Sequence, residues 1–369
     1  MVRRLLYING LATIAAVIHH SMHWILTGLF WWTDRYRSVT IPNYDELGSL
    51  SYYGIRLIDQ LAFFGVPAFL FVSGFFIAIA TGSNEKTVSW KIVGNRIKKL
   101  LPPYFLWSLV IILVDGLLGQ TYSAQSIIKL LITGGVAPPF YYVPVLIQLL
   151  ILSVFLVPLS RARPKLMLVF TLLLQIPVTI ATYTSILEKG AADTGLFFSI
   201  FRDWHLPGYV FWFVLGLVVK FHLPEAQKFL ERNFRLLVIG AILTFFLGVV
   251  EWDFLRGLSN REWISPQLTL VDKVFALLFL LVLISIRQPQ LPLHSQLNYI
   301  GVRSYGVYLT HSLVLTLVAK MTYHLLPSLL AYAYIFGFVL VATGLILPLI
   351  SMELMNRSPL RRYYQYVFG

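Results

Sequence analysis

Long apolar segments, separated by short polar connections, run through the whole sequence. They cover residues 5–31, 57–80, 100–118, 140–159, 166–184, 205–221, 236–252, 267–286, 301–320 and 329–352. A helix of about 20 residues crosses a hydrocarbon core of about 30 Å. In hydrocarbon the backbone must satisfy its own hydrogen bonds, which favours helices. The pattern therefore predicts an all-α integral membrane protein with about ten transmembrane helices.

The composition excludes an ordinary soluble protein. Hydrophobic residues make up 58% of the 369 residues and charged residues only 12%, whereas soluble domains carry about 25% charged residues. Short connections leave no room for a soluble appendage, so we expect one transmembrane domain over residues 1–369. The chain has no cysteine, which excludes disulfides and thiolate metal sites.

The basic residues indicate the orientation in the membrane. The net charge is +13, and Lys and Arg gather in alternate connections, including 81–99 and the tail 357–369. Cytoplasmic connections carry this bias and lie against anionic lipid. We therefore expect both termini in the cytoplasm, the lipid bilayer as a partner and no binding of nucleic acid. The first apolar segment is too long for a signal peptide and is interpreted as a retained span.

Three histidines share one face of the first predicted helix. His19, His20 and His23 fall within about 100° of one another at helical spacing. Ionisable groups inside spans are costly and often functional, and imidazole is the usual general base near neutral pH. Hydrogen bonding to neighbouring helices is the alternative. A metal site held by these histidines alone is less favoured, and no metal is expected.

A second polar stripe lies in the ninth predicted helix. Ser304, Tyr308 and His311 share one face at helical spacing. Such a stripe either lines a cavity or joins helices by hydrogen bonds. Asp59, Asp115, Asp272 and Lys273 also lie in or beside spans, and adjacent Asp272 and Lys273 point to different sides of their helix.

The connection before the third span ends in a basic cluster of Arg96, Lys98 and Lys99, followed by Pro103-Tyr104. Positive charge there serves to hold the connection in the cytoplasm. Alternatively, Arg96 and Lys99, one helical turn apart, bind phosphate groups of a cytoplasmic ligand.

Taken in order, five segments resemble the acyltransferase-3 family of multi-span bacterial membrane enzymes. Its first-helix pattern is Leu-Asp-x-Leu-Arg followed after ten residues by a histidine; Ile8-Asn9-Gly10-Leu11-Ala12 occupies the opening, and His23 lies at the expected distance. The other four matches are Phe63-Phe64-Gly65-Val66 with Ser73-Gly74-Phe75, Arg96-x-x-Lys99 before Pro103-Tyr104, Tyr141-Tyr142 with Gln148 and Pro158, and 304–311.

The resemblance implies transfer of an acyl group, usually acetyl, from acyl-CoA to a carbohydrate hydroxyl at the cell inner membrane. It implies His23 as the catalytic base, with His20 as the alternative. Arg96, Lys98 and Lys99 would bind acyl-CoA, the donor and only cofactor expected. His19, Ser304, Tyr308 and His311 would line the substrate cavity.

Two positions depart from the family pattern. Ala12 replaces the first-helix arginine that the family associates with catalysis, and Asn9 replaces its acidic residue. Two other functions therefore stay open. One is a transporter or polysaccharide-export component of the same fold without acyl chemistry, and the other is a structural subunit of an envelope polysaccharide system. The acceptor, acyl length and oligomeric state are not set by the sequence.

Overall fold

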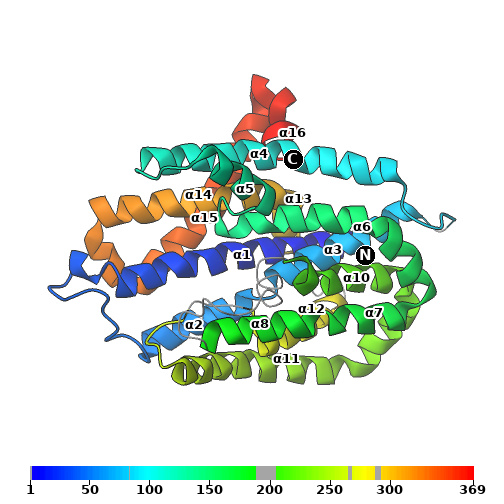
Figure 1. Cartoon of the computed structure of the whole chain (residues 1–369), viewed down its shortest axis with the longest axis horizontal. Helices are drawn as coiled ribbons and strands as arrows, with labels where there is room; N and C mark the ends of the chain where they lie inside the picture. Colours follow the sequence, from blue (N-terminus) through cyan, green and yellow to red (C-terminus); the bar gives the residue numbers. More distant parts are fainter. Residues whose placement is uncertain (1, 83, 188–204, 265–267, 287–291) are drawn as a thin grey trace. The chain divides into compact units, whose positions relative to one another are not determined.

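The computed structural model describes residues 2–82, 84–187, 205–264, 268–286 and 292–369, and within these ranges the chain is helical, without strands (Figure 1). The α-helices within these ranges are α1 (Val2–Phe30), α2 (Leu50–Ala62), α3 (Gly65–Thr81), α4 (Trp90–Leu117), α5 (Ala124–Thr133), α6 (Tyr142–Ala162), α7 (Pro164–Leu173), α8 (Gln175–Leu187), α10 (Leu206–Phe221), α11 (Leu223–Ser259), α12 (Leu270–Ser285), α13 (His294–Val302), α14 (Ser304–Leu325), α15 (Ala333–Arg357) and α16 (Tyr364–Val367). Short 3-10 turns are η1 (Thr33–Arg35), η2 (Pro138–Tyr141), η4 (Pro327–Ala331) and η5 (Pro359–Tyr363).

The prediction of a helical membrane protein is confirmed. Seven helical segments of the described chain are long and apolar enough to cross a membrane. The other three predicted spans coincide with α10 and α12, of 16 residues each, and α14, of 22 residues. Residue 267, where the predicted span 267–286 begins, lies outside the described residues. The total of ten spans and the orientation of the termini remain predictions.

Packing divides the chain into two compact units, and neither is continuous in sequence. The first consists of Met1–Ile8, Phe63–Ile97 and Val145–His294. The second consists of Asn9–Ala62, Lys98–Pro144 and Ser295–Gly369. A single domain over the whole chain remains a prediction.

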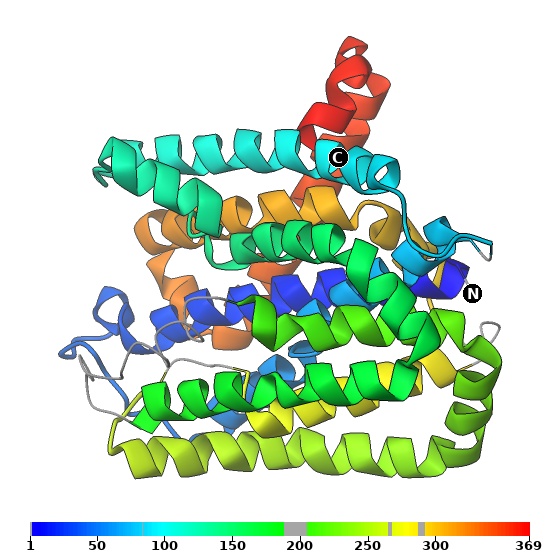
Figure 2. The same ribbon diagram turned by 45° about the vertical axis from the view of Figure 1, so that its right-hand side comes forward.

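In the first unit, small residues bring α3 and α10 close together. A Cβ added to Gly74 would lie 2.0 Å from the Phe213 carbonyl oxygen, and one added to Gly216 would lie 2.0 Å from that of Phe71. Only glycine allows this approach of two membrane helices. The glycine of the Ser-Gly-Phe motif therefore has a packing role. In the same unit, α11 and α12 run side by side (Figure 2).

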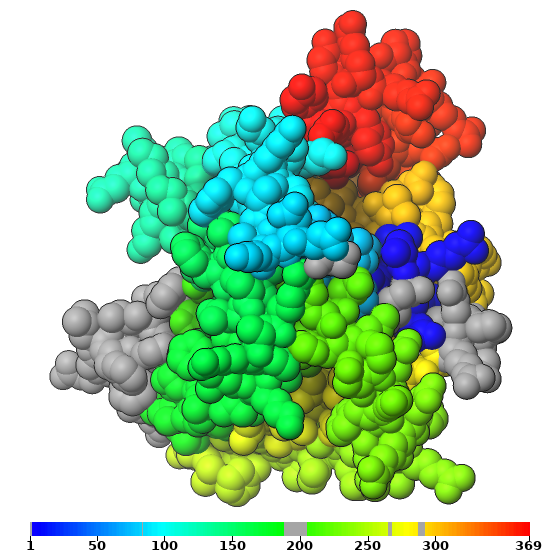
Figure 3. All heavy atoms as spheres, turned by 90° about the vertical axis from the view of Figure 1, so that its right-hand side faces the viewer, coloured from blue at the N-terminus to red at the C-terminus, as the bar shows by residue number. Residues whose placement is uncertain are grey.

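In the second unit, α14 packs along α15, and glycines of α15 receive side chains of α1. Gly337 faces Ile25, and Gly344 faces Val17. At the end of the chain, Phe368 lies in a buried cluster with Val307 and Met352. The end of α15, η5 and α16 form one contiguous group of atoms (red in Figure 3). This packing fixes α1 and α14, which carry the predicted polar stripes.

Two predicted spans are interrupted where a proline follows. The segment 57–80 contains a turn at Phe63-Phe64, and 166–184 is interrupted at Leu174. Pro67 and Pro177 lie in the first turns of α3 and α8, where a missing amide donor costs little. Each proline thus favours a new helix start.

The basic connection before the third span is helical, which differs from the expected loop. Because α4 begins at Trp90, Arg96, Lys98 and Lys99 lie within it, and Pro102 and Pro103 lie in its interior. Prolines inside membrane helices are tolerated where neighbouring groups satisfy the freed carbonyls.

Candidate active site

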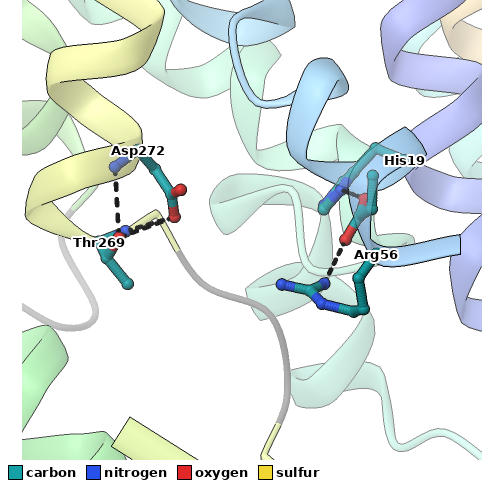
Figure 4. Close-up of polar contacts among 5 residues, drawn as sticks. His19, Arg56, Thr269 and Asp272 are labelled. Carbon is teal, nitrogen blue, oxygen red and sulfur yellow. Dashed lines mark hydrogen bonds and ion pairs between the residues drawn. The ribbon is translucent and has the colours of Figure 1, made fainter. Parts of the chain in front are cut away.

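His19 contacts a buried carboxylate. Its Nδ1 lies 2.7 Å from Asp59 Oδ1, and the other carboxylate oxygen, Oδ2, accepts a hydrogen bond of 2.8 Å from Arg56 Nη1. The side chains of Asp59 and Arg56 are 1% and 2% exposed, whereas that of His19 is 33% exposed. Figure 4 shows His19 and Arg56 on opposite sides of this carboxylate. The arrangement is a buried ion pair that presents a half-buried imidazole.

The amphipathic helix α2 positions this ion pair. Arg56 and Asp59 are three residues apart and therefore share a face, which also carries buried Tyr52 and Ile55. The Ser49 hydroxyl accepts a hydrogen bond from the Tyr52 amide, which supports the first turn of α2. Burying a charge is costly unless it is paired. Removing either Arg56 or Asp59 would therefore leave the other charge buried without its partner.

His20 extends the group towards α14. Its ring centroid lies 5.4 Å from that of His19 and 5.3 Å from that of His311. The His311 ring is fully buried and 6.0 Å from the Tyr308 ring. His311 Nδ1 lies 3.0 Å from the Val307 carbonyl oxygen, so Nδ1 carries a proton and donates it to that oxygen. The structure thus brings together His19, His20, Tyr308 and His311.

Two other predicted site residues lie elsewhere in the second unit. His23 is exposed, and its ring lies 5.1 Å from the Trp24 ring rather than against a carboxylate. Ser304 is the first residue of α14, seven residues before His311 and hence about 10 Å away along the helix. The structure therefore does not bring Ser304 into the histidine group.

The predicted donor-binding residues lie on α4. Arg96 is half-buried and donates a hydrogen bond of 3.2 Å to the Phe76 carbonyl oxygen. Lys98 and Lys99 are exposed. Arg96 belongs to the first compact unit, whereas Lys98 and Lys99 belong to the second. Their role in binding remains a prediction.

Ala12, at the position of the family's arginine, is fully buried. The arginine in contact with the site's carboxylate is instead Arg56, on another helix. The sequence indicates Asp59 as an ionisable residue within a predicted span, whereas Arg56 was missed. The available signal was an oppositely charged pair three residues apart in an otherwise apolar segment.

The first unit contains a separate polar network. Both Tyr183 and Thr269 donate hydrogen bonds through their hydroxyls to the Glu251 carboxylate. Thr269 and Asp272 form a capping box at the start of α12, drawn in Figure 4. Lys273 Nζ donates a hydrogen bond of 2.8 Å to Thr179 Oγ1. Asp272 and Lys273 thus hydrogen-bond to different partners, and the network joins α8, α11 and α12.

Over the described ranges, no group of three or more His, Asp or Glu side chains is arranged to hold a metal ion. His19, His20 and Asp59 instead form a site suited to proton transfer: an imidazole whose second nitrogen is oriented by a carboxylate.

Comparison with known proteins identifies the family of this chain. The sequence model of the acyltransferase-3 family, described as an acyltransferase domain, matches residues 5–347. Curated relatives from Staphylococcus aureus strains MRSA252 and NCTC 8325 are named "Probable poly-beta-1,6-N-acetyl-D-glucosamine export protein". Each is 23% identical over 286 residues, which cover 76% of this chain and 73% of the relative. No solved structure matches the chain. Because the family match extends over nearly its whole length, the chain belongs to the acyltransferase-3 family of membrane proteins.

Proposed function

We propose that this protein transfers an acyl group, with acetyl as the expected case, from acyl-CoA to a hydroxyl of an envelope carbohydrate. The family supports acyl transfer in general, and the relatives' names point to an amino-sugar polymer as the kind of acceptor. The observation that carries the proposal is the 2.7 Å contact between His19 Nδ1 and Asp59 Oδ1. It gives one histidine of α1 the partner that a general base needs.

The carboxylate determines which nitrogen of His19 reacts. With the Nδ1 proton directed at Asp59, the neutral ring keeps its lone pair on Nε2. Nε2 takes the proton of the acceptor hydroxyl while the hydroxyl oxygen bonds to the thioester carbonyl carbon. The carbon–sulfur bond then breaks, and the proton passes from the imidazolium to the departing thiolate. The products are an ester and free CoA.

Asp59 and Arg56 act as positioning residues in this scheme. Asp59 holds the ring of His19 in one orientation and stabilises the imidazolium that forms during the reaction. Arg56 keeps the buried Asp59 paired. His20 lies beside the His19 imidazole, His311 lies next to His20, and Tyr308 lies next to His311. Ser304 would lie further along the α14 wall of the substrate cavity.

The other two histidines of α1 are the alternative bases. Family spacing selects His23, and His20 is the second choice from the sequence. His19 is favoured among the three because its Nδ1 contacts a carboxylate, whereas the ring of His23 contacts Trp24.

For the donor, we propose that Arg96 and Lys99, with Lys98, bind the phosphate groups of acyl-CoA. Guanidinium and ammonium groups suit phosphate, and the family pattern places basic residues at this point. We further propose ten spans in the cell inner membrane, with both termini cytoplasmic. In that orientation α4 carries the cluster at its cytoplasmic end, while His19, about 26 Å along α1 from Val2, lies in the outer half.

The names of the relatives favour a second candidate, export of a glycan without acyl transfer. Purified full-length protein supplied with labelled acetyl-CoA and short β-1,6-linked N-acetylglucosamine oligosaccharides distinguishes the two. Acyl transfer predicts oligosaccharide that gains one acetyl group, detected by mass, and release of free CoA. Unmodified oligosaccharide that accumulates across a proteoliposome membrane would instead support export.

A further inference from the structure

A series of contacting aromatic rings begins beside His23 and leads away from the histidine group. The Trp24 ring lies 5.1 Å from that of His23 and 5.5 Å from that of Trp32, and Trp32 lies 4.8 Å from Tyr323. On Tyr323 the Arg35 guanidinium lies 4.6 Å from the ring centroid. We call Trp24, Trp32 and Tyr323 the aromatic ladder.

Three parts of the second unit supply the ladder. Trp24 is in the last two turns of α1, Trp32 is in the connection after it, and Tyr323 is near the end of α14. Arg35 also donates a hydrogen bond of 3.3 Å to the Tyr323 carbonyl oxygen, which ties the connection to α14. All three rings are half-buried. They therefore form a fixed surface that remains partly accessible.

We propose that the aromatic ladder is the acceptor subsite, on which the sugar rings of a glycan stack. This inference rests on the proposed function, because it names the binding site of the same acceptor. The C–H-rich faces of pyranose rings pack on aromatic faces, while their hydroxyls project at the edges. Trp and Tyr supply large contact areas with few rotatable bonds, so that little entropy is lost on binding.

The position of the ladder fits this occupant. Trp24 lies five residues after His19, about 7.5 Å along α1, and exposed His23 lies between them in sequence. Around α1 the two side chains lie about 140° apart, so a glycan on Trp24 would reach the proposed base past His23, whose ring contacts Trp24. Further sugars of the same chain would extend along Trp32 and the edge of Tyr323, since Arg35 covers one face of the Tyr323 ring. A polymer, rather than a single monosaccharide, matches the length of the ladder.

An aromatic belt at the membrane surface is the other explanation for Trp and Tyr at helix ends. A belt requires only that each ring lies at the headgroup level. Here the rings contact one another across separate segments and one carries a guanidinium. Trp31 provides a matched comparison, because it is adjacent to Trp32 and half-buried, but contacts Phe30 and Tyr44 instead.

The test measures equilibrium binding of a β-1,6-linked N-acetylglucosamine oligosaccharide to full-length protein in lipid nanodiscs, without acyl-CoA. Trp32→Leu and Tyr323→Leu should each weaken binding roughly threefold to tenfold. Trp32→Phe, which keeps a ring, should retain most of the affinity. Trp31→Leu should bind within about twofold of the unmodified protein.

Equal affinities for Trp32→Leu and the unmodified protein would overturn the proposal, as would equal losses for Trp31→Leu and Trp32→Leu. Failure of the unmodified protein to bind the oligosaccharide would also overturn it. The assay contains no donor, so it tests the subsite separately from acyl transfer. If the protein shows no transferase activity but binds the oligosaccharide in a manner that depends on Trp32, the subsite proposal stands and the proposal of acyl transfer is refuted.

Discussion

His19 Nδ1 and Asp59 Oδ1 lie 2.7 Å apart and join α1 to α2 at a carboxylate that Arg56 also contacts. The buried pair costs desolvation, which good geometry and hydrogen bonds offset. The contact with Asp59 holds the His19 imidazole in one orientation and leaves Nε2 as the nitrogen that accepts a proton. The same three residues therefore support both the packing of the second unit and the proposed chemistry, and variants can separate the two roles.

Neutralising both members of the buried pair should harm stability less than neutralising one. Asp59→Asn leaves the Arg56 charge without its carboxylate, at a cost of roughly 3–5 kcal/mol. The double variant Asp59→Asn with Arg56→Gln removes both charges and should recover a large part of that loss. Thermal unfolding of the purified proteins measures both effects. Strictly additive losses would show that the two charges do not depend on each other.

The double variant should stay inactive even where its stability recovers. The neutral amide introduced by Asp59→Asn cannot stabilise an imidazolium at His19, and the analogous change in a Ser-His-Asp triad costs about 10⁴-fold in turnover. Here we expect a loss of roughly 10²–10⁴ in the rate of acetyl transfer. Near-normal turnover in a folded double variant would show that Asp59 serves packing alone.

The apolar pattern and the family motifs predicted a large part of the fold. Continuous hydropathy is sufficient to identify membrane helices because the bilayer requires internal backbone hydrogen bonding. The interruptions at Phe63-Phe64 and Leu174 were missed, although Pro67 and Pro177 were available signals. Hydropathy does not report them, since the residues on both sides are equally apolar.

The site was predicted only in part. Helical spacing grouped His19, His20 and His23 on one face, but it could not tell which of them meets a carboxylate on another helix. The contact with a carboxylate depends on how α2 packs on α1. The spacing of residues within α1 gives no information about that packing. Arg56 was missed because it lies one residue before the predicted span 57–80 and so was not among the ionisable residues of the spans. The pairing of ionisable residues within one helix was the stronger signal.

Packing of α3 on α10 should depend on glycine. In Gly74→Ala the new Cβ would lie 2.0 Å from the Phe213 carbonyl oxygen, so we expect destabilisation of roughly 1–3 kcal/mol. Gly94→Ala, on α4, is the control, because no atom lies within 4 Å of its added Cβ. It should be neutral, or more stable by up to about 1 kcal/mol through helix propensity. Equal unfolding temperatures for the two variants would contradict the described α3–α10 contact.

Donor binding should require the basic cluster of α4. Replacing both Arg96 and Lys99 with Gln should weaken acyl-CoA binding at least about tenfold, because each charge-assisted hydrogen bond contributes roughly 1.5–3 kcal/mol. The dependence of binding on salt should also decrease. Lys91→Gln, an exposed residue of the same helix, is the control. Unchanged affinity in the double variant would leave the cluster with a topological role.

The proposed orientation places the connections at Ser38 and Lys86 on opposite sides of the membrane. Because the chain has no cysteine, Ser38→Cys and Lys86→Cys each introduce one unique thiol at an exposed position. In intact cells an impermeant thiol reagent should label Ser38→Cys, while Lys86→Cys should require permeabilised cells. Labelling of both variants in intact cells would contradict the ten-span topology.

The most direct test of the central claim is the transfer rate of His19→Ala with labelled acetyl-CoA and an oligosaccharide acceptor, measured beside His23→Ala, His20→Ala and the control His222→Ala from the other unit. We expect His19→Ala to lower turnover by roughly 10²–10⁴ while acyl-CoA binding and folding are retained. His20→Ala and His23→Ala should lose less, and His222→Ala should remain active. Full turnover in folded His19→Ala, with loss in His23→Ala or His20→Ala instead, would contradict the account.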